Sequence, residues 1–404
     1  MISWIFILGT NPALSVEEIL TVLGCTMDAV TDVGPDFAIV STAEEFAPVD
    51  LLSRLGGTIK IGRLLRTMSG ISQLTPEVWR QSLSLDADKA KKIIFGFSQY
   101  GLPKSAYALQ GVGLKVKKLL KAEGYNARLM ANKEGQLSSV AVQKNDLIGS
   151  ELLIIKGSAS ELYLGLTEAV QDFESYGQRD YGRPERDSAR GMLPPKVAQM
   201  MINLAQIPEH GAVLDPFCGL GTVAQEAWQM DRDWQIVCSD NDAVAVEQAK
   251  KNIQWLIKDK EAEQVRFTVT PVQSLTKIYD QPIFDAVVTE PYLGPARELQ
   301  RSLSETRRQQ IVTEVSQLYL QAFGQFTKVV KSGGRVVMVW PMYQRGRDYE
   351  LMPIMTEVAK LGFRPLMPAI RHSRLASELT ERGTLWYHRQ DQAVAREIVI
   401  WEKL

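Results

Sequence analysis

The sequence predicts an α/β protein in which a Rossmann-like domain forms the C-terminal half and smaller α+β units precede it. Two observations support this prediction. From Pro195 onward, helix and strand patterns alternate, which is typical of a parallel sheet covered by helices on both faces. Residues 1–68 follow the order βαββαβ, which is typical of a ferredoxin-like unit. A chain of 404 residues is long enough for two or three domains.

The N-terminal unit begins with an apolar strand, and a helix follows it. Ser15 and Glu18 have the spacing of a capping box, which predicts that this helix runs from Ser15 to Leu23. The other elements expected in residues 1–68 are strands at 3–8, 27–32, 37–41 and 59–67 and a helix at 48–55.

A second small α/β unit is expected over residues 69–175. Its predicted elements are a long helix at 104–123 and strands at 91–99, near Arg128, and at 139–143, 151–156 and 161–166. The apolar side chains of the long helix share one arc, and the opposite arc carries Lys115, Lys117, Lys118 and Lys121. Lysine-rich arcs are also common on helices that only face solvent, so both interpretations remain open.

Residues 176–194 are expected to connect the domains, because they are rich in Gly, Pro and Arg and poor in apolar residues. The C-terminal domain, residues 195–404, then alternates between helices and strands. Helices are predicted at 195–207, 222–230, 243–258, 305–331 and 350–361. Strands are predicted at 212–215, 235–239, 265–269, 284–289, 335–340, 384–389 and 395–402.

Composition excludes several classes of protein. No apolar run reaches the roughly 18–20 residues that a membrane span needs, and no secretory signal is recognisable. Cys25, Cys218 and Cys238 form no C-x-x-C pair, which argues against zinc fingers and disulfide frameworks. We therefore expect a cytoplasmic protein without a metal ion, and we expect a monomer.

The formal net charge of −1 hides a segregation of charge along the chain. Residues 1–50 contain eight acids and no Lys or Arg, whereas residues 51–150 contain sixteen bases and six acids. The basic excess of the second segment predicts a surface that faces a polyanion such as RNA. A basic face that is merely solvated is the alternative.

A strand, a glycine turn and a helix follow one another in the segment AVLDPFCGLGT, residues 212–222. In a doubly wound sheet the ligand lies at the carboxyl ends of the strands, beside the first such turn. Gly219 and Gly221 allow the backbone to approach a ligand closely. The carboxylate of Asp215 suits a cationic ligand better than a pyrophosphate, which disfavours a nicotinamide or flavin cofactor.

The next strand ends at Asp240, about twenty residues beyond the glycine turn, where an acid can bind both hydroxyls of a ribose. The alternative is N-capping of the following helix by Asp240 or Asp242, and the two roles can coexist. A ribose site beside a carboxylate for a cation indicates S-adenosyl-L-methionine (SAM), a nucleoside that carries a sulfonium.

The fourth predicted strand of the C-terminal domain, at 284–289, is followed by Glu290, Pro291 and Tyr292. A carboxylate and a backbone carbonyl that accept the N–H bonds of an exocyclic amine draw its lone pair out of conjugation with the base. An aromatic ring can hold an extruded base by stacking. These three residues are therefore the catalytic candidates, and an ordinary strand-end turn with a surface Glu is the alternative.

Three motifs together resemble the THUMP-domain tRNA methyltransferases that make N2-methylguanosine at position 10 of tRNA. They are RDYGRPERDSARGMLPPKVAQMMINLA in the connector, DPFCGLGT in the glycine loop and TEPYLGP at the end of the fourth strand. The resemblance implies a ferredoxin-like domain over 1–68, a THUMP-type RNA-binding domain over 69–175 and a SAM-dependent methyltransferase domain over 195–404. It also implies that tRNA is the partner and that Glu290, Pro291 and Tyr292 are catalytic.

The motifs, the charge pattern and the resemblance together give two sets of candidate binding residues. The SAM-binding set is Asp215, Phe217, Cys218, Gly219, Gly221, Thr222, Asp240, Asn241, Val272, Gln273, Met192 and Pro194. The RNA-binding set is Lys115, Lys117, Lys118, Lys121, Arg183, Arg186 and Arg190.

Two departures from the family pattern stand out. Where the family has D-P-P-[YFW], this chain has Glu290-Pro291-Tyr292-Leu293, with a longer acid and the aromatic residue one place earlier. Residues 270–273 also lack the acid that the family uses for the adenine amine. Two alternatives remain open: a DNA adenine or cytosine amino-methyltransferase, and a non-catalytic RNA-binding protein with a degenerate methyltransferase fold.

Overall fold

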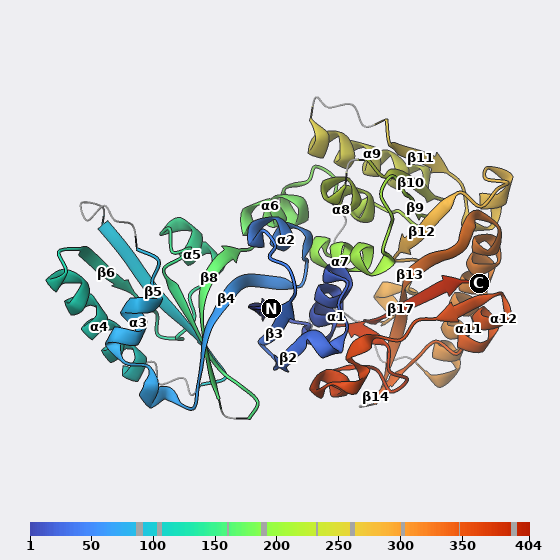
Figure 1. The fold of residues 1–404 in the computed structure, drawn as a ribbon. Coiled ribbons are helices and arrows are strands. Elements are labelled where there is room, and N and C mark those ends of the chain that lie inside the picture. Colours follow the sequence, from blue (N-terminus) through green and yellow to red (C-terminus); the bar gives the residue numbers. More distant parts are fainter. Residues whose placement is uncertain are drawn as a thin grey trace. The chain divides into compact units, whose positions relative to one another are not determined.

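The computed structural model describes residues 1–85, 92–102, 107–159, 161–186, 192–231, 233–258, 263–299, 304–346, 348–388 and 394–404. The chain divides into two compact units (Figure 1). The first consists of Met1–Val16, Cys25–Phe173 and Ser373–Leu375, and the second of Glu17–Gly24, Glu174–His372 and Ala376–Leu404.

The first unit is built on one eight-stranded sheet with the order β2-β3-β1-β4-β8-β7-β5-β6. Its strands are β1 (Ile2–Leu8), β2 (Val30–Val33), β3 (Phe37–Thr42), β4 (Thr58–Met68), β5 (Lys92–Tyr100), β6 (Asn126–Met130), β7 (Glu151–Lys156) and β8 (Leu162–Val170). The first four strands have the antiparallel order of a ferredoxin-like unit. Because β4 also pairs with β8, the sheet continues without a break from residues 1–68 into residues 69–175.

A buried polar network lies where the two halves of this sheet meet. Lys60 of β4 donates to the Oε1 of Glu151 of β7 at 2.5 Å, and both side chains are at most 1% exposed. Ser98 of β5 and Thr167 of β8 also donate to the Glu151 carboxylate. A buried ion pair is tolerated when further hydrogen bonds satisfy it, and this one links four strands.

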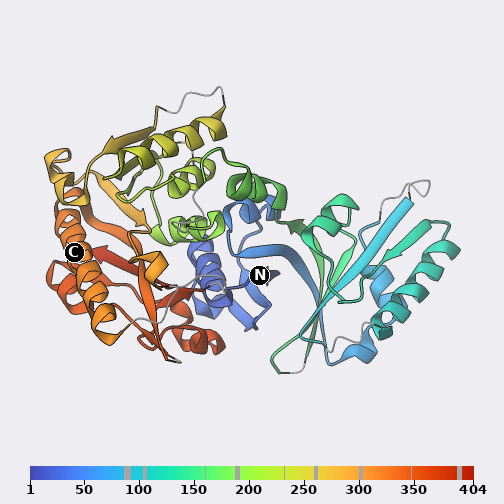
Figure 2. The ribbon, with the colours of Figure 1, turned by 180° about the vertical axis from the view of Figure 1, so that it is seen from behind.

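The helices of the first unit pack on the same sheet. They are α2 (Pro48–Arg54), α3 (Pro76–Ser82), α4 (Tyr107–Ala122) and α5 (Ser139–Lys144), and α4 packs against β6 (Figure 2). In α4 the side chains of Val116 and Leu120 are fully buried. Of the four lysines of this helix, Lys115, Lys118 and Lys121 are exposed and Lys117 is half-buried, as the predicted arcs require.

The second unit contains a nine-stranded sheet whose main order is β11-β10-β9-β12-β13-β17-β15. Its strands are β9 (Ala212–Asp215), β10 (Gln235–Asp240), β11 (Val265–Val269), β12 (Phe284–Thr289), β13 (Val330–Arg345), β14 (Asp348–Glu350), β15 (Phe363–Pro365), β16 (Leu385–Tyr387) and β17 (Ala395–Lys403). The five strands from β11 to β13 are parallel, and β17 is antiparallel to β13. Because β9 lies between β10 and β12, the three strand ends singled out in the sequence are neighbours.

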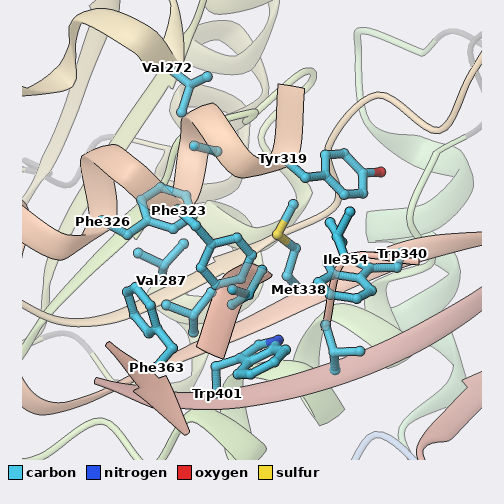
Figure 3. Packing of buried hydrophobic residues seen from close by; sticks show 14 of the residues in the cluster. Val272, Val287, Tyr319, Phe323, Phe326, Met338, Trp340, Ile354, Phe363 and Trp401 are labelled. Atoms are coloured by element: carbon cyan, nitrogen blue, oxygen red, sulfur yellow. The ribbon is translucent and has the colours of Figure 1, made fainter. Parts of the chain in front are cut away.

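Helices cover both faces of this sheet (Figure 1). The helices α7 (Pro195–Ala205), α8 (Thr222–Met230) and α9 (Ala243–Ile257) pack on one face, and α11 (Glu305–Val329) and α12 (Met355–Lys360) pack on the other. The face below α11 holds a large apolar core (Figure 3). Alternate residues of β13, Met338 and Trp340, point into it beside Phe323 of α11 and Trp401 of β17.

Among the predicted elements that differ from the structure, three stand out. The helix α1 (Pro12–Leu23) already begins at Pro12, so Ser15 is no cap and its Oγ donates to the Asn11 carbonyl at 2.8 Å. Residues 139–143 were predicted as a strand but form α5, which begins where the Ser138 hydroxyl accepts a hydrogen bond from the Ala141 N–H. The helix predicted at 350–361 begins only at Met355, after Pro353, which disfavours helical backbone before it.

The connector packs against α8 of the second unit through buried side chains. It begins with α6 (Phe173–Gly177) and one π-helical turn, Gln178–Gly182. Arg179 donates through Nε and Nη2 to both carboxylate oxygens of Glu226 of α8, at 2.6 and 3.1 Å.

Among the described helices, none combines the length and apolar character that a membrane crossing needs.

Candidate active site

A pocket lies at the carboxyl ends of β9 and β12. It is lined by Met192, Leu193, Asp215, Phe217, Cys218, Gly219, Leu220, Thr222, Val223 and Glu290. Met192 comes from the connector, Asp215 ends β9, and Glu290 follows β12. The pocket therefore brings together residues from three segments that the sequence predicted to share one site.

The glycine loop between β9 and α8 has the backbone that the sequence predicts. Gly219 and Gly221 adopt φ values of +49° and +77°, which residues with a Cβ rarely adopt. A Cβ on Gly219 would meet no atom within 4 Å, so this face of the loop is open. A Cβ on Gly221 would lie 3.1 Å from the Cβ of Ala249, so here the glycine also permits close packing of α9.

Asp240 and Asp242 divide the two roles that the sequence left open. The Asp242 carboxylate accepts hydrogen bonds from the N–H groups of Val244 and Ala245 and caps α9. The Asp240 carboxylate instead accepts from the Gly219 N–H at 2.9 Å and the Asp242 N–H at 3.0 Å. Each carboxylate oxygen of Asp240 has a second lone pair, so this half-buried group holds the loop and can still accept from a ligand.

Asp215 is a buried carboxylate at the end of β9, with 3% of its surface exposed. Its Oδ1 accepts from the Thr289 hydroxyl at 2.7 Å and from the Phe217 N–H at 3.3 Å. Burial raises the pKa of Asp215 to about 7, and the nearby charges of Asp240 and Glu290 add to this rise. No described cation forms an ion pair with this carboxylate, which makes it a suitable contact for a cationic ligand.

We expect the substitution Asp215→Asn to stabilise the protein at pH 8. The folded pKa lies above the value of a free carboxyl, so the folded state loses stability as the pH rises from about 4 to about 7, while the Asn variant does not. The variant should gain a few kcal/mol at pH 8 and almost nothing at pH 4, at about 1.4 kcal/mol for each tenfold change in proton affinity. Urea denaturation of both proteins at the two pH values measures this. An equal difference at both values would show that Asp215 does not titrate between them.

Glu290 forms a contact that the sequence analysis missed. Arg396 of β17 donates to both of its carboxylate oxygens, from Nε at 2.5 Å and from Nη2 at 3.2 Å. The two side chains are 11% and 5% exposed. The available signal was the pair Arg396-Glu397 directly before the apolar run 398–401, because charges beside such a run must find buried partners.

The segment after Glu290 is held by two tyrosine hydroxyls. The Tyr319 hydroxyl donates to the Tyr292 carbonyl at 3.0 Å, and the Tyr343 hydroxyl donates to the Leu293 carbonyl at 2.9 Å. Gly294 follows with a φ of +102°. The Tyr292 side chain is 53% exposed, so the structure fixes its backbone while leaving its ring accessible.

Several predicted SAM-binding residues lie away from the lining of this pocket. Val272 is 3% exposed and belongs to the apolar core on the α11 face. The Gln273 amide donates to the side chain of Gln321 of α11 at 2.9 Å. Asn241 is exposed beside Asp240, and Pro194 caps α7.

The predicted RNA-binding residues are divided between the two units. Lys115, Lys117, Lys118 and Lys121 belong to the first unit, and Arg183 and Arg186 to the second. Arg186 is exposed and lies over the Tyr181 ring at 5.2 Å. Arg183 does not fit the prediction, because it is 3% exposed and donates to the Thr222 hydroxyl at 2.8 Å. Arg190 lies outside the described residues.

Within the described residues, no group of three or more His, Cys, Asp or Glu side chains is arranged to hold a metal ion.

Comparison with known proteins agrees with this geometry. Residues 183–347 match the sequence model of the family described as UPF0020: RMKL-like, methyltransferase domain. The crystal structure of TrmN from Thermus thermophilus covers all of this chain and is itself fully covered, with a TM-score of 0.53 and 14% identity. This likeness confirms the predicted fold class.

Two curated relatives are named tRNA (guanine(10)-N2)-dimethyltransferase. The protein from Methanothermobacter thermautotrophicus is 29% identical over 154 residues, which are 38% of this chain and 40% of the relative. The protein from Methanocaldococcus jannaschii is 29% identical over 128 residues, 29% of this chain and 34% of the relative. The matches thus span less than half the length of these relatives, and they confirm the resemblance seen in the sequence.

Proposed function

We propose that this chain is a SAM-dependent methyltransferase that methylates the exocyclic 2-amino group of a guanosine in tRNA, at position 10. Its methyltransferase domain spans residues 195–404, its THUMP-type RNA-binding domain residues 69–175, and it acts in the cytoplasm as a monomer. The names of the two curated relatives support the tRNA substrate. The observation that carries the proposal is the convergence of Asp215, Asp240 and Glu290 at the ends of three adjacent parallel strands.

The residues around the pocket fit SAM. The open face of Gly219 leaves room for a ligand beside the loop, and Asp240 has lone pairs left for the ribose hydroxyls. The Asp215 carboxylate lines the pocket where the cationic methionine half is expected, and a cation beside it favours its charged form. When bound, SAM supplies an electrophilic methyl group on its sulfonium, so the protein has mainly to orient the two reactants and exclude water.

Glu290 and the Pro291 carbonyl orient the amine by accepting its two N–H bonds, while the accessible Tyr292 ring packs on the base. The Arg396 ion pair holds the Glu290 carboxylate in one position, and the hydroxyls of Tyr319 and Tyr343 hold the backbone that follows. This support keeps the acceptors in place before the amine arrives. The longer acid of this chain is thus matched by a partner on β17.

The test is to incubate the protein with methyl-labelled SAM and unmodified bulk tRNA, digest the RNA to nucleosides and identify the labelled one. We expect N2-methylated guanosine. Label in duplex DNA instead of tRNA would select the DNA amino-methyltransferase. Binding of both SAM and tRNA without any product would select the non-catalytic alternative, and either result would contradict the proposal.

The lysine arc of α4 provides a second test of the tRNA substrate. We expect the combined change of Lys115, Lys117, Lys118 and Lys121 to Gln to lower tRNA affinity and to flatten its dependence on salt. Contacts between lysines and phosphates release condensed counterions, so the slope of log affinity against log salt reports their number. A loss of about one or two contacts is expected, because not every lysine of an arc reaches a phosphate.

The measurement is tRNA binding over a salt series for the variant and the unchanged protein. Gln has nearly the helix propensity of Lys, so the helix should persist. SAM affinity serves as the control and should not change, because α4 belongs to the other unit. An unchanged slope would mean that this arc is merely solvated.

A further inference from the structure

Arg183 is a buried cation whose role the proposed site does not explain. Its side chain is 3% exposed. Nη1 donates to the Thr222 hydroxyl and Nη2 to the Met192 sulfur, both at 2.8 Å. Its Nε is buried without a hydrogen-bond partner among the described residues. Both of its partners are neutral.

Arg179, four residues earlier, has the paired carboxylate that Arg183 lacks within the described ranges. Arg179 is also buried, and it occupies both oxygens of the Glu226 carboxylate. In the described part of the chain, no carboxylate lies within ion-pair distance of Arg183. Asp180 and Glu226 attract Arg183 only from beyond that distance. A buried guanidinium without a directly paired anion is costly unless a ligand supplies one.

The surroundings of Arg183 favour an anion in the pocket. Its two partners, Met192 and Thr222, both line the pocket. Thr222 is the first residue of α8, and the N-cap, Gly221, has no side chain to cap the free N–H groups of this nine-residue helix. Free N–H groups and the helix dipole at a helix start stabilise negative charge.

The same pocket offers negative charge from Asp215. A guanidinium bonded to two lining residues and a carboxylate in the lining itself suit a zwitterion, such as the α-amino acid end of the methionine half of SAM. We propose that Arg183 binds the carboxylate of SAM, with Asp215 as the counterpart for its ammonium group. This inference rests on the proposed function, and it gives Arg183 a role in cofactor recognition in place of RNA binding.

The test compares the binding of SAM with that of decarboxylated SAM, which keeps the adenosine, the sulfonium and the amine but lacks the carboxylate. Titration calorimetry on the full chain, without tRNA, measures both. The unchanged protein should prefer SAM by about 10- to 100-fold, the range expected for hydrogen bonds to a charged group. In Arg183→Met this preference should nearly vanish, because SAM affinity falls while the affinity for the decarboxylated form is kept.

Two further variants sharpen the result. Arg183→Lys keeps the charge without the forked geometry and should retain part of the preference. Arg266→Met removes an exposed arginine of the same unit and should retain all of it. Equal losses for both ligands in Arg183→Met would make Arg183 a purely structural residue and overturn the inference. If Arg183→Met keeps the preference for SAM but loses tRNA affinity in a separate tRNA titration, the inference is also overturned, in favour of an RNA phosphate. Binding of neither ligand by the unchanged protein would instead refute the proposed function.

Discussion

The substitution Glu290→Gln should slow methyl transfer by roughly a hundredfold or more, the usual effect of removing a positioned proton acceptor. Gln keeps the shape of the side chain but offers one acceptor oxygen instead of two. It also leaves the buried Arg396 without its carboxylate. We therefore expect the loss in the rate of the chemical step, with the affinities for SAM and tRNA largely retained. Single-turnover kinetics at saturating enzyme measures this rate.

Two other variants test whether the ion pair with Arg396 positions Glu290. Arg396→Lys keeps a positive charge beside Glu290 but not the two-point contact, so its rate should fall less than that of Glu290→Gln. Glu290→Asp restores the acid of the family but withdraws the carboxylate from Arg396 by one methylene. It should therefore lose rate as well, since this chain places its carboxylate through that contact. A full single-turnover rate for Glu290→Gln would show that Glu290 does not orient the amine.

The substitution Asp240→Ala should weaken SAM binding by a few kcal/mol, the cost of leaving two ribose hydroxyls without their acceptor. It also removes the acceptor of the Gly219 N–H, which holds the open loop. Both effects act on the cofactor, so tRNA affinity should stay nearly unchanged. Titration calorimetry with SAM, together with tRNA binding at one salt concentration, tests both parts.

The matched control is Asp242→Ala, two residues further on. Asp242 caps α9, so its removal should cost about 1 kcal/mol of stability while leaving SAM affinity intact. The two substitutions should thus have different effects: Asp240→Ala lowers SAM affinity, whereas Asp242→Ala lowers the stability of the protein. SAM affinity like that of the unchanged protein in Asp240→Ala would remove Asp240 from the site.

The sequence by itself determined most elements and the core of the candidate site. Strands β9, β11 and β12 have the predicted bounds, because turn residues flank these short segments and limit where each strand can begin and end. Asp215, the glycine loop and Glu290 could be grouped in advance, since parallel strands deliver their carboxyl ends to one edge of a sheet. The spacing of residues within one strand–turn–helix segment can be read directly from the sequence.

Sequence patterns gave wrong predictions where a short segment could form more than one local structure. Residues 139–143 contain a short apolar run with two valines, which suits a strand, but the Ser138 cap and packing of Val142 in a small apolar cluster favour a helix. At the N-terminus, Pro12 is already suited to the first helical turn, so the capping-box spacing of Ser15 and Glu18 was coincidental. Short elements bury little surface of their own, so their surroundings decide their conformation.

Only the tertiary structure decided how charged side chains are paired. Arg396 and Glu290 are 106 residues apart, and their ion pair depends on β17 crossing the sheet beside β13. Arg183 looked like one of several arginines for RNA, yet the fold buries it beside the pocket and leaves Arg186 exposed. Burial and charge pairing arise from segments distant in sequence that meet in space. A buried charge must find its partner wherever the chain brings one, and no local pattern encodes that meeting.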